Sequence, residues 1–370
     1  MSNGRLTIAD VARVAGVSPG AVSLALNGRP GVSDATRRRI VAVVRELGWT
    51  PSHRARALSS SRALAVGLVV ARTPDALAAD PFFPAFLAGL ETVLSQREQA
   101  LVLHMVPDRC SEHDRYRRLA ADGRVDGVFL LDLHSRDPRP ALLEELGLPS
   151  VLVGPDLGGP GVNTVAMDDR PGITAVVEHL VGLGHRNIAH VAGPRDYVHA
   201  ASRRGAWARA LRAAGLPLGR CVHSDFSASG GVRATKLLLD QDHPPTAIVY
   251  ANDIMAVAGM STAQGRGVEV PARLSVSGFD DSPVSAHLQP ALTTVRIDVV
   301  GWGAAAARAL LALIDGEPLP PVELAPPRLL IRASTAPPPA PPSPVTPVRA
   351  DRPPLSSRRR TATALTSKES

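Results

Sequence analysis

Residues 7–36 constrain this chain most, because they show the pattern of two short helices joined by a tight turn and followed by a third helix. Thr7 stands where a helix N-cap is expected, and Gly16 suits the positive φ that commonly ends a helix. Ser18 followed by Pro19 is a typical start for the next helix. The order helix, glycine-containing turn, helix predicts a helix-turn-helix DNA-binding unit, with an ordinary helical hairpin as the alternative.

Positive charge is concentrated at the two ends of the chain. Residues 1–62 hold ten arginines and three acidic residues, and residues 337–370 also carry an excess of basic side chains. The segment between them is net negative, although the whole chain has a formal net charge of +7. A compact basic domain indicates a polyanionic partner, while a merely solvated basic face is the alternative.

Several motifs make this chain similar to the lactose-repressor (LacI/GalR) family of bacterial transcription regulators. They are TIADVARVAGVS, VSxxLNG, VSDATRRRI and LGWTP. The resemblance implies a DNA-binding domain at 1–50 and a hinge helix at 51–63. Leu58 occupies the position of a leucine that wedges into the minor groove, a known device for kinking DNA. Packing of Leu58 on its own domain is the alternative. The DNA-binding residues expected in this way are Thr7, Ser18, Pro19, Gly20, Ser23, Asn27, Ser33, Arg54, Arg56 and Leu58.

The second helix departs from the family where bases are read. Pro19, Gly20 and Leu24 stand where many members carry long polar side chains. None of these three residues makes the bidentate hydrogen bonds that distinguish base pairs, although Leu24 suits a thymine methyl group. We therefore expect hinge insertion and DNA shape to carry an unusual share of the specificity.

From residue 64 onward, apolar runs of strand length alternate with helical patterns, which predicts βαβ units with parallel sheets. The expected strands are Val66–Ala71, Leu101–Val106, Val125–Leu131, Ser150–Gly154, Ile188–Gly193, Val222–Phe226, Ala247–Ala251 and Leu274–Phe279. The expected helices are Ala85–Ser95, Thr174–Leu183, Arg204–Ala214, Val232–Leu239, Ile254–Ala263 and 299–315. The predicted fold is an α-helical helix-turn-helix domain followed by an α/β core of two parallel-sheet, Rossmann-like subdomains. The expected ranges are 64–336 for the core, with an N-subdomain at about 64–167 and 299–325 and a C-subdomain at about 168–298 and 326–336, and 337–370 for a disordered Pro/Ser/Arg-rich tail.

Polar and aromatic side chains gather where the predicted strands end, which is where open α/β sheets bind ligands. Further motifs extend the resemblance to about residues 5–335, and they imply a core like that of periplasmic sugar-binding proteins, with an effector in its cleft. They are LGHRNIAHVAG, YANDIMA, VSGFDDSP and LTTVRID. The effector-binding residues expected in this way are Phe82, Phe83, Arg203, Phe226, Asn252 and Asp280. Asp253 and Asp281 are as well explained as helix N-caps.

The remaining patterns exclude other classes of protein. The sequence contains no nucleophile elbow, phosphate-binding loop or zinc-protease motif, which argues against an enzyme. Cys110 and Cys221 have no metal-ligand spacing and are expected to be buried apolar residues. No apolar segment resembles a signal peptide or a membrane span, which argues against an exported binding protein.

Together these observations predict a cytoplasmic, ligand-responsive transcriptional repressor, without a metal or cofactor, that acts as a homodimer on a pseudo-palindromic operator in double-stranded DNA. A sugar is the favoured effector, and a nucleobase or a protein corepressor is the alternative. An inert role for the C-terminal tail is favoured over nonspecific DNA binding.

Overall fold

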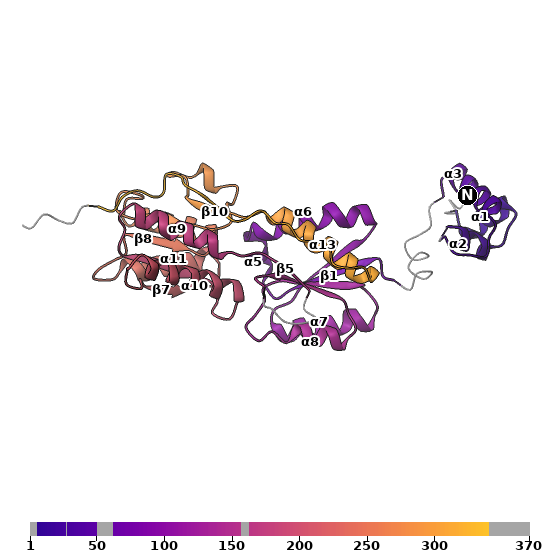
Figure 1. The fold of residues 1–370 in the computed structure, drawn as a ribbon, viewed down its shortest axis with the longest axis horizontal. Helices are drawn as coiled ribbons and strands as arrows, with labels where there is room; N and C mark the ends of the chain where they lie inside the picture. The colour runs from indigo at the N-terminus through magenta and orange to yellow at the C-terminus, as the bar shows by residue number, and fades with distance from the viewer. Residues whose placement is uncertain (1–5, 27, 50–61, 157–162, 340–370) are drawn as a thin grey trace, which may run out of the picture. The chain divides into compact units, whose positions relative to one another are not determined.

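The computed structural model describes residues 6–26, 28–49, 62–156 and 163–339 of the chain. Its N-terminal part contains the three predicted helices, α1 (Ile8–Ala15), α2 (Pro19–Leu26) and α3 (Asp34–Glu46), shown in Figure 1. The predicted hinge helix lies almost entirely outside the described residues, and so does the tail beyond residue 339.

Local hydrogen bonds explain where these helices begin and end. The backbone N–H and the hydroxyl of Thr7 donate to the Asp10 carboxylate at 3.0 and 2.8 Å, so that the N-terminus of α1 carries a capping box. Gly16 follows α1 at φ +65°, a conformation that favours glycine. The hydroxyl of Ser33 accepts a hydrogen bond from the Thr36 N–H and caps α3.

The three helices enclose a small apolar core. Trp49 closes it and donates its indole N–H to the Leu6 carbonyl at 2.9 Å, which ties the two ends of the domain together. This packing holds α2 with one face buried and the other toward solvent. The buried core residues are Val11, Ala12, Ala15, Val22, Ala25, Ile40, Val43 and Trp49.

The first α/β subdomain is built on a parallel sheet in the order β2-β1-β3-β4-β5. Its strands are β1 (Ala65–Val70), β2 (Ala100–Met105), β3 (Gly127–Leu130), β4 (Ser150–Gly154) and β5 (Thr164–Ala166). Two pairs of helices cover the faces of this sheet (Figure 1): α6 (Phe82–Leu94) with α13 (Val299–Asp315), and α7 (Arg109–Ala121) with α8 (Arg139–Glu145). Because both faces are covered, β1 is buried along its whole length.

Helices α6 and α13 approach each other closely at two glycines. A Cβ atom added at Gly89 would lie 2.1 Å from the Val300 carbonyl oxygen, and one added at Gly303 would lie 2.3 Å from the Phe86 carbonyl oxygen. Only glycine permits this backbone contact. Helix α13 follows the second subdomain in the sequence but packs in the first through this contact. The apolar face predicted for residues 299–315 thereby lies in the core.

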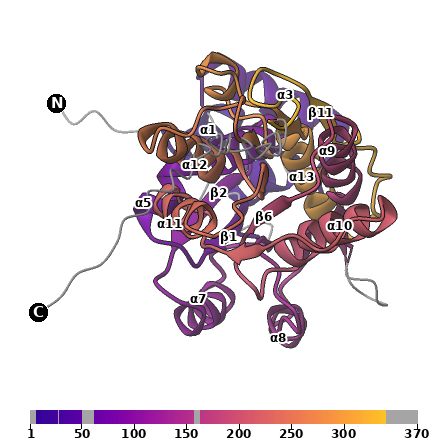
Figure 2. The same cartoon turned by 90° about the vertical axis from the view of Figure 1, so that its left-hand side faces the viewer.

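The second subdomain contains a parallel sheet in the order β7-β6-β8-β9. Its strands are β6 (Ile188–Ala192), β7 (Cys221–His223), β8 (Ala247–Tyr250) and β9 (Ser275–Ser277). Figure 2 shows the two helix pairs that flank it: α9 (Arg170–Gly182) with α10 (Val198–Ala213), and α11 (Ala228–Leu239) with α12 (Asp253–Gly265). A separate antiparallel pair joins β10 (Thr294–Arg296) to β11 (Arg328–Leu330). The predicted fold class is therefore confirmed.

Some predicted elements differ from the observed ones. Helices α7 and α8 and strands β5, β10 and β11 were not predicted, because α7 has no regular apolar stripe and the three strands are only three residues long. The predicted strand Val222–Phe226 was too long: β7 ends at His223, and Phe226 lies in the following loop at φ +64°. The predicted burial of the cysteines was wrong, since Cys110 is exposed at the start of α7 and Cys221 is half-buried on β7.

Among the described residues, no single helix has the length and apolar character needed to cross a bilayer. Helices α1 and α2 meet those criteria only when they are taken together, with a bend of 98° between them. Their apolar side chains form the core of the N-terminal domain.

Candidate functional site

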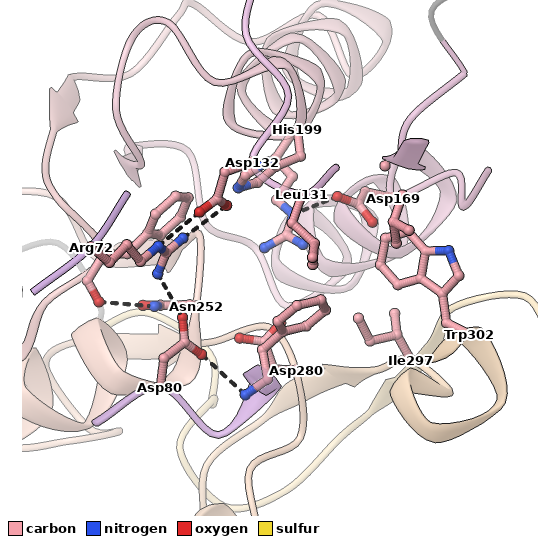
Figure 3. Close-up of a pocket in the computed structure, with 15 residues that line it drawn as sticks. Arg72, Asp80, Leu131, Asp132, Asp169, His199, Asn252, Asp280, Ile297 and Trp302 are labelled. Atoms are coloured by element: carbon pink, nitrogen blue, oxygen red, sulfur yellow. Dashed lines mark hydrogen bonds and ion pairs between the residues drawn. The ribbon is translucent and has the colours of Figure 1, made fainter. Parts of the chain in front are cut away.

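Each sheet has one point where the strand order reverses, between β1 and β3 in the first and between β6 and β8 in the second. Ligands of open α/β folds bind at such switch points, beyond the carboxyl ends of the strands. A cavity lined by residues of both subdomains lies at both of them (Figure 3). Its lining residues are Arg72, Asp80, Phe82, Leu131, Asp132, Val153, Gly154, Asp169, His199, Arg203, Phe226, Asn252, Asp280, Ile297 and Trp302.

The wall from the first subdomain is organised by Arg72, which lies two residues beyond the end of β1. Its guanidinium donates to both oxygens of Asp132 at 2.8 and 2.9 Å and to Asp80 at 3.0 Å, as Figure 3 shows. Burial disfavours these charges, but the carboxylates outweigh it and raise the pKa of Arg72. Asp80 also accepts from the Phe82 N–H at 3.1 Å. The cluster thereby holds the loop after β1 against the loop after β3.

The wall from the second subdomain is organised by Arg203 on α10. Its Nε donates to Asp169 at 2.7 Å and its Nη1 donates to the Ala251 carbonyl at 2.6 Å. The guanidinium carbon also lies 3.8 Å from the centroid of the Phe279 ring, a cation–π geometry. Three elements of the second subdomain are thus joined beneath the cavity.

Asn252 faces the cavity, but both ends of its side chain hold the protein together. Its Oδ1 accepts from the Met255 N–H at 3.0 Å and caps α12, while its Nδ2 donates to the Phe226 carbonyl at 3.0 Å. This bond fixes the loop that carries the Phe226 ring. Asn252, and neither Asp253 nor Asp281, is therefore the N-cap of α12.

Asp280 and His199 are the polar side chains that remain open to a ligand. Among the described residues, neither the Asp280 carboxylate nor the His199 imidazole forms a hydrogen bond, and both line the cavity (Figure 3). Burial raises the pKa of Asp280 well above its usual value, although Arg203 opposes the shift. Burial also lowers the pKa of His199 to about 4, and Arg203 adds to this effect. The cavity therefore offers a carboxyl group and a neutral imidazole to a ligand.

Aromatic rings supply the apolar part of the cavity. The Phe226 ring is stacked on His199 with centroids 5.3 Å apart, and Phe82 meets Trp302 edge to face at 6.0 Å. Gly193 makes room for Phe226, since a Cβ atom there would lie 2.1 Å from its ring. Rings on two sides of a polar cavity suit a flat ligand with hydroxyl groups at its edge.

The structure brings Phe82, Arg203, Phe226, Asn252 and Asp280 together, as predicted, but not Phe83. Phe83 is 2% exposed and packs in the apolar core, because α6 begins at Phe82 and the next residue turns inward. The missed lining residues include Arg72, Asp132, Asp169, His199 and Trp302. Arg72 and Asp132 follow β1 and β3 within two residues, which is the signal that the sequence offered for them.

The candidate DNA-binding side chains surround α2. The Ser18 hydroxyl accepts from the Ala21 N–H at 3.1 Å, so Ser18 caps α2 while remaining exposed. Thr7 and Ser33 likewise stand at the exposed N-termini of α1 and α3. Helix N-termini favour phosphate oxygens through their free N–H groups. These three hydroxyls therefore lie where backbone contacts to DNA are favourable.

The remaining DNA-binding candidates differ in what the structure says of them. Pro19 and Gly20 are exposed in the first turn of α2, and Ser23 is half-buried one turn later. Leu24 packs toward the following loop, since a Cβ atom at Gly31 would lie 3.3 Å from its side chain. The candidates outside the described residues are Asn27, Arg54, Arg56 and Leu58.

Two family models match the chain. The model for bacterial regulatory proteins of the lacI family matches residues 7–52, and the model for a periplasmic binding protein-like domain matches residues 177–335. The first match covers the three-helix domain, and the second covers most of the second subdomain.

Similar proteins span nearly the whole chain. The HTH-type transcriptional regulator CelR of Thermobifida fusca is 37% identical over 324 residues, which cover 86% of this chain and 95% of CelR. The HTH-type transcriptional regulator GalR of Escherichia coli is 31% identical over 331 residues, covering 85% of this chain and 91% of GalR.

Solved structures agree with these sequence matches. A CelR–cellobiose complex superimposes with a TM-score of 0.69 and 36% identity, covering 89% of this chain and 100% of that chain. The lac repressor dimer bound to operator and the anti-inducer ONPF gives a TM-score of 0.76 and 29% identity, covering 90% and 100%. This chain therefore belongs to the LacI family of bacterial regulatory proteins and is a DNA-binding transcriptional regulator.

Proposed function

We propose that this regulator is a repressor whose affinity for its operator is set by a small sugar bound in the cavity. One observation carries the proposal: Asp280 and His199 line the cavity together with the rings of Phe226 and Trp302, and neither has a hydrogen-bond partner among the described residues. Sugar hydroxyls donate well to a carboxylate, and the apolar face of a sugar ring packs on aromatic rings. The similarity to CelR, which was solved with cellobiose, supports the same class of ligand here.

The cavity couples the ligand to the arrangement of the two subdomains. Asp280 and Phe226 belong to one wall, while Phe82 and Trp302 belong to the other. The subdomains also touch directly, because the Ser135 N–H donates to the Asp196 carbonyl at 3.0 Å. A ligand that contacts both walls favours one orientation over the other, and only such differential affinity shifts a conformational equilibrium. Effector and operator affinities are then reciprocally coupled, typically by about 1–3 kcal/mol.

A thermal-shift and DNA-binding experiment on the full chain tests the effector. Cellobiose, maltose, trehalose and a set of purines are screened for a rise in melting temperature, and an operator is selected from a random DNA pool. We expect one sugar to raise the melting temperature and to change operator affinity about 5- to 150-fold. A purine that does both, while no sugar does either at millimolar concentration, would overturn the proposal.

We also infer that the regulator acts as a homodimer on a pseudo-palindromic operator. Each chain supplies one helix-turn-helix, and operator symmetry mirrors protein two-fold symmetry. The similarity to a lac repressor dimer supports this assembly. Because the target is chromosomal DNA, we propose a cytoplasmic location. Sedimentation velocity at micromolar concentration, with and without operator, tests the dimer, and a monomer in both samples would contradict it.

We further propose that the hinge segment carries much of the operator specificity. Pro19 and Gly20 are exposed on α2 but have no side-chain groups that read base pairs. We expect Leu58→Ala to reduce operator affinity much more than affinity for nonspecific DNA at the same salt concentration. A variant that keeps the full ratio of the two affinities would show that Leu58 does not contribute to specificity.

A further inference from the structure

The charged side chains that line the cavity do not balance. Two guanidinium groups face twice as many carboxyl groups, and His199 adds no charge near neutral pH. The lining of the cavity therefore holds more acidic groups than its two guanidinium groups can pair. The charged lining residues are Arg72, Arg203, Asp80, Asp132, Asp169 and Asp280.

Neither guanidinium offers a free pair of parallel N–H groups to an anionic ligand. Arg72 uses Nε and both terminal nitrogens for Asp132 and Asp80. Arg203 uses Nε for Asp169 and Nη1 for a backbone carbonyl, and its face lies over a phenylalanine ring. Recognition of a phosphate or carboxylate by arginine commonly needs a free pair of parallel N–H groups. Arg72 therefore has no free nitrogen, and Arg203 has only Nη2 outside these hydrogen bonds among the described residues.

The carboxyl group of Asp280 sits among other carboxylates. Burial raises its pKa most, Arg203 opposes this shift, and Asp253, Asp80 and Asp169 each raise the pKa further. Two further arginines, Arg296 and Arg332, lie near this loop, but both pair with Asp281 and do not line the cavity. An anionic group in the cavity therefore meets an excess of carboxyl groups and no free guanidinium fork, whereas a hydroxyl group finds an open acceptor.

We propose that the cavity accepts uncharged sugars and excludes phosphorylated and carboxylated sugars, and that Asp280 is the residue that sets this discrimination. The inference rests on the proposed sugar-binding function. It narrows the ligand class, because a family of one fold can bind charged or uncharged effectors, depending on the side chains in the cleft.

Isothermal titration of the full chain with matched sugars tests the inference. The first step finds which of cellobiose, maltose and trehalose binds. The second compares that disaccharide with its derivatives carrying a phosphate, a carboxylate or an amine at C6. We expect the phosphate and the carboxylate to bind at least about 100-fold more weakly than the parent, and the amine to stay within about 10-fold.

The carboxylate and the amine are similar in size and opposite in charge, so their comparison separates charge from shape. A carboxylate that binds within about threefold of the parent overturns the inference and leaves the proposed function intact. Equal losses for the carboxylate and the amine also overturn it, because shape then decides. If no sugar binds, the proposed function and the inference fail together.

Two Asp→Asn variants test the role assigned to Asp280. Asp280→Asn keeps the size of the side chain and removes its acidic group. We expect it to reduce the preference for the parent sugar over its C6 carboxylate by about tenfold. Asp168→Asn is the matched control, because Asp168 pairs with Arg170 at the surface and does not line the cavity. An equal change in both variants would show that Asp280 does not set the discrimination.

Discussion

Two arginine clusters in the first subdomain use similar residues for different purposes. The Arg139 cluster comprises Arg139, Glu112, Asp137 and Tyr116, and the Arg72 cluster comprises Arg72, Asp80 and Asp132. They meet at Asp132, whose backbone carbonyl accepts from Arg139 at 3.1 Å while its carboxylate accepts from Arg72. The difference between the two clusters is whether their neighbourhood leaves a polar group without a partner.

The Arg139 cluster is closed. Arg139 donates to Glu112 at 2.7 Å, to both oxygens of Asp137, and to two backbone carbonyls. Tyr116 donates its hydroxyl to the same Glu112 oxygen at 3.1 Å. The side chains of Arg139, Glu112 and Asp137 are at most 3% exposed. A closed buried network of this kind holds elements together, here α7 and α8 against the end of β3, and offers nothing to a ligand.

The cavity beside the Arg72 cluster is open. Arg72 is paired as completely as Arg139, but Asp280 and His199 line the same space without a hydrogen-bond partner among the residues that the structure describes. The ion pairs hold the walls of the cavity in place, and the side chains of Asp280 and His199 are available to bind a ligand. A cluster of charged residues therefore indicates a binding site only where it leaves such a group open.

The largest expected effect is a loss of protein stability when the closed Arg139 cluster is broken. Arg139→Ala leaves two buried carboxylates without a counter-ion, so we expect it to reduce the free energy of unfolding by about 3–5 kcal/mol. Urea denaturation followed by circular dichroism measures this loss. Arg170→Ala is the control, because its pair with Asp168 is exposed and should leave the transition unchanged. Similar midpoints for the two variants would contradict the comparison.

Replacement of Asp280 should have the opposite pattern, with little effect on protein stability and a large effect on ligand affinity. We expect Asp280→Ala to weaken binding of the effector sugar about 10- to 100-fold, because the sugar loses its hydrogen bonds to this carboxyl group. The melting temperature without ligand should stay the same or rise, because burial disfavours this carboxylate. Operator affinity without effector should remain near that of the wild type. A variant that still responds to the sugar with normal affinity and amplitude would contradict the open-site interpretation.

The sequence was sufficient for features that depend on local order. The caps of α1 and α3 follow from Thr7 and Ser33, and Arg203 and Asp280 were found because they lie just beyond strands or in the first turns of a helix. The carboxyl ends of parallel strands meet at one edge, so residues far apart in sequence could be grouped without knowledge of side-chain contacts.

Features that depend on pairing across the fold were not predicted. Arg72 and Asp132 are 60 residues apart, and their contact requires β1 and β3 to be neighbours, which the sequence pattern does not specify. Arg139 and Glu112 resemble surface residues of polar helices until both helices pack on the sheet. Phe83 was misplaced because successive residues of a helix point about 100° apart. Where the helix begins therefore decides which of two neighbouring residues lines the cavity and which packs in the core.

A smaller effect on sugar affinity is expected from a change behind the Phe226 ring that lines the cavity. A Cβ atom at Gly193 would meet the Phe226 ring, so we expect Gly193→Ala to displace the ring and weaken sugar binding about fivefold. Titration calorimetry measures the affinity, and the melting temperature reports any loss of packing. Gly182→Ala is the matched control, since nothing lies within 4 Å of the added atom. Unchanged affinity in Gly193→Ala would show that Phe226 does not need its present position.

The smallest expected effect is on the pH dependence of stability, where the two regions should behave alike. Burial lowers the pKa of His134, beside the Arg139 cluster, and of His199, in the cavity, to about 4. Because the unfolded chain takes up these protons near pH 6.5, each histidine contributes stability above that pH that is lost as the pH falls toward 4. We expect a loss on the order of 1 kcal/mol per histidine between pH 7.5 and 5. Denaturation at both pH values should show a flatter dependence for His134→Gln and for His199→Gln. At pH 7.5 only His199→Gln should weaken sugar binding, and an equal weakening in both variants would remove the distinction between the closed cluster and the open cavity.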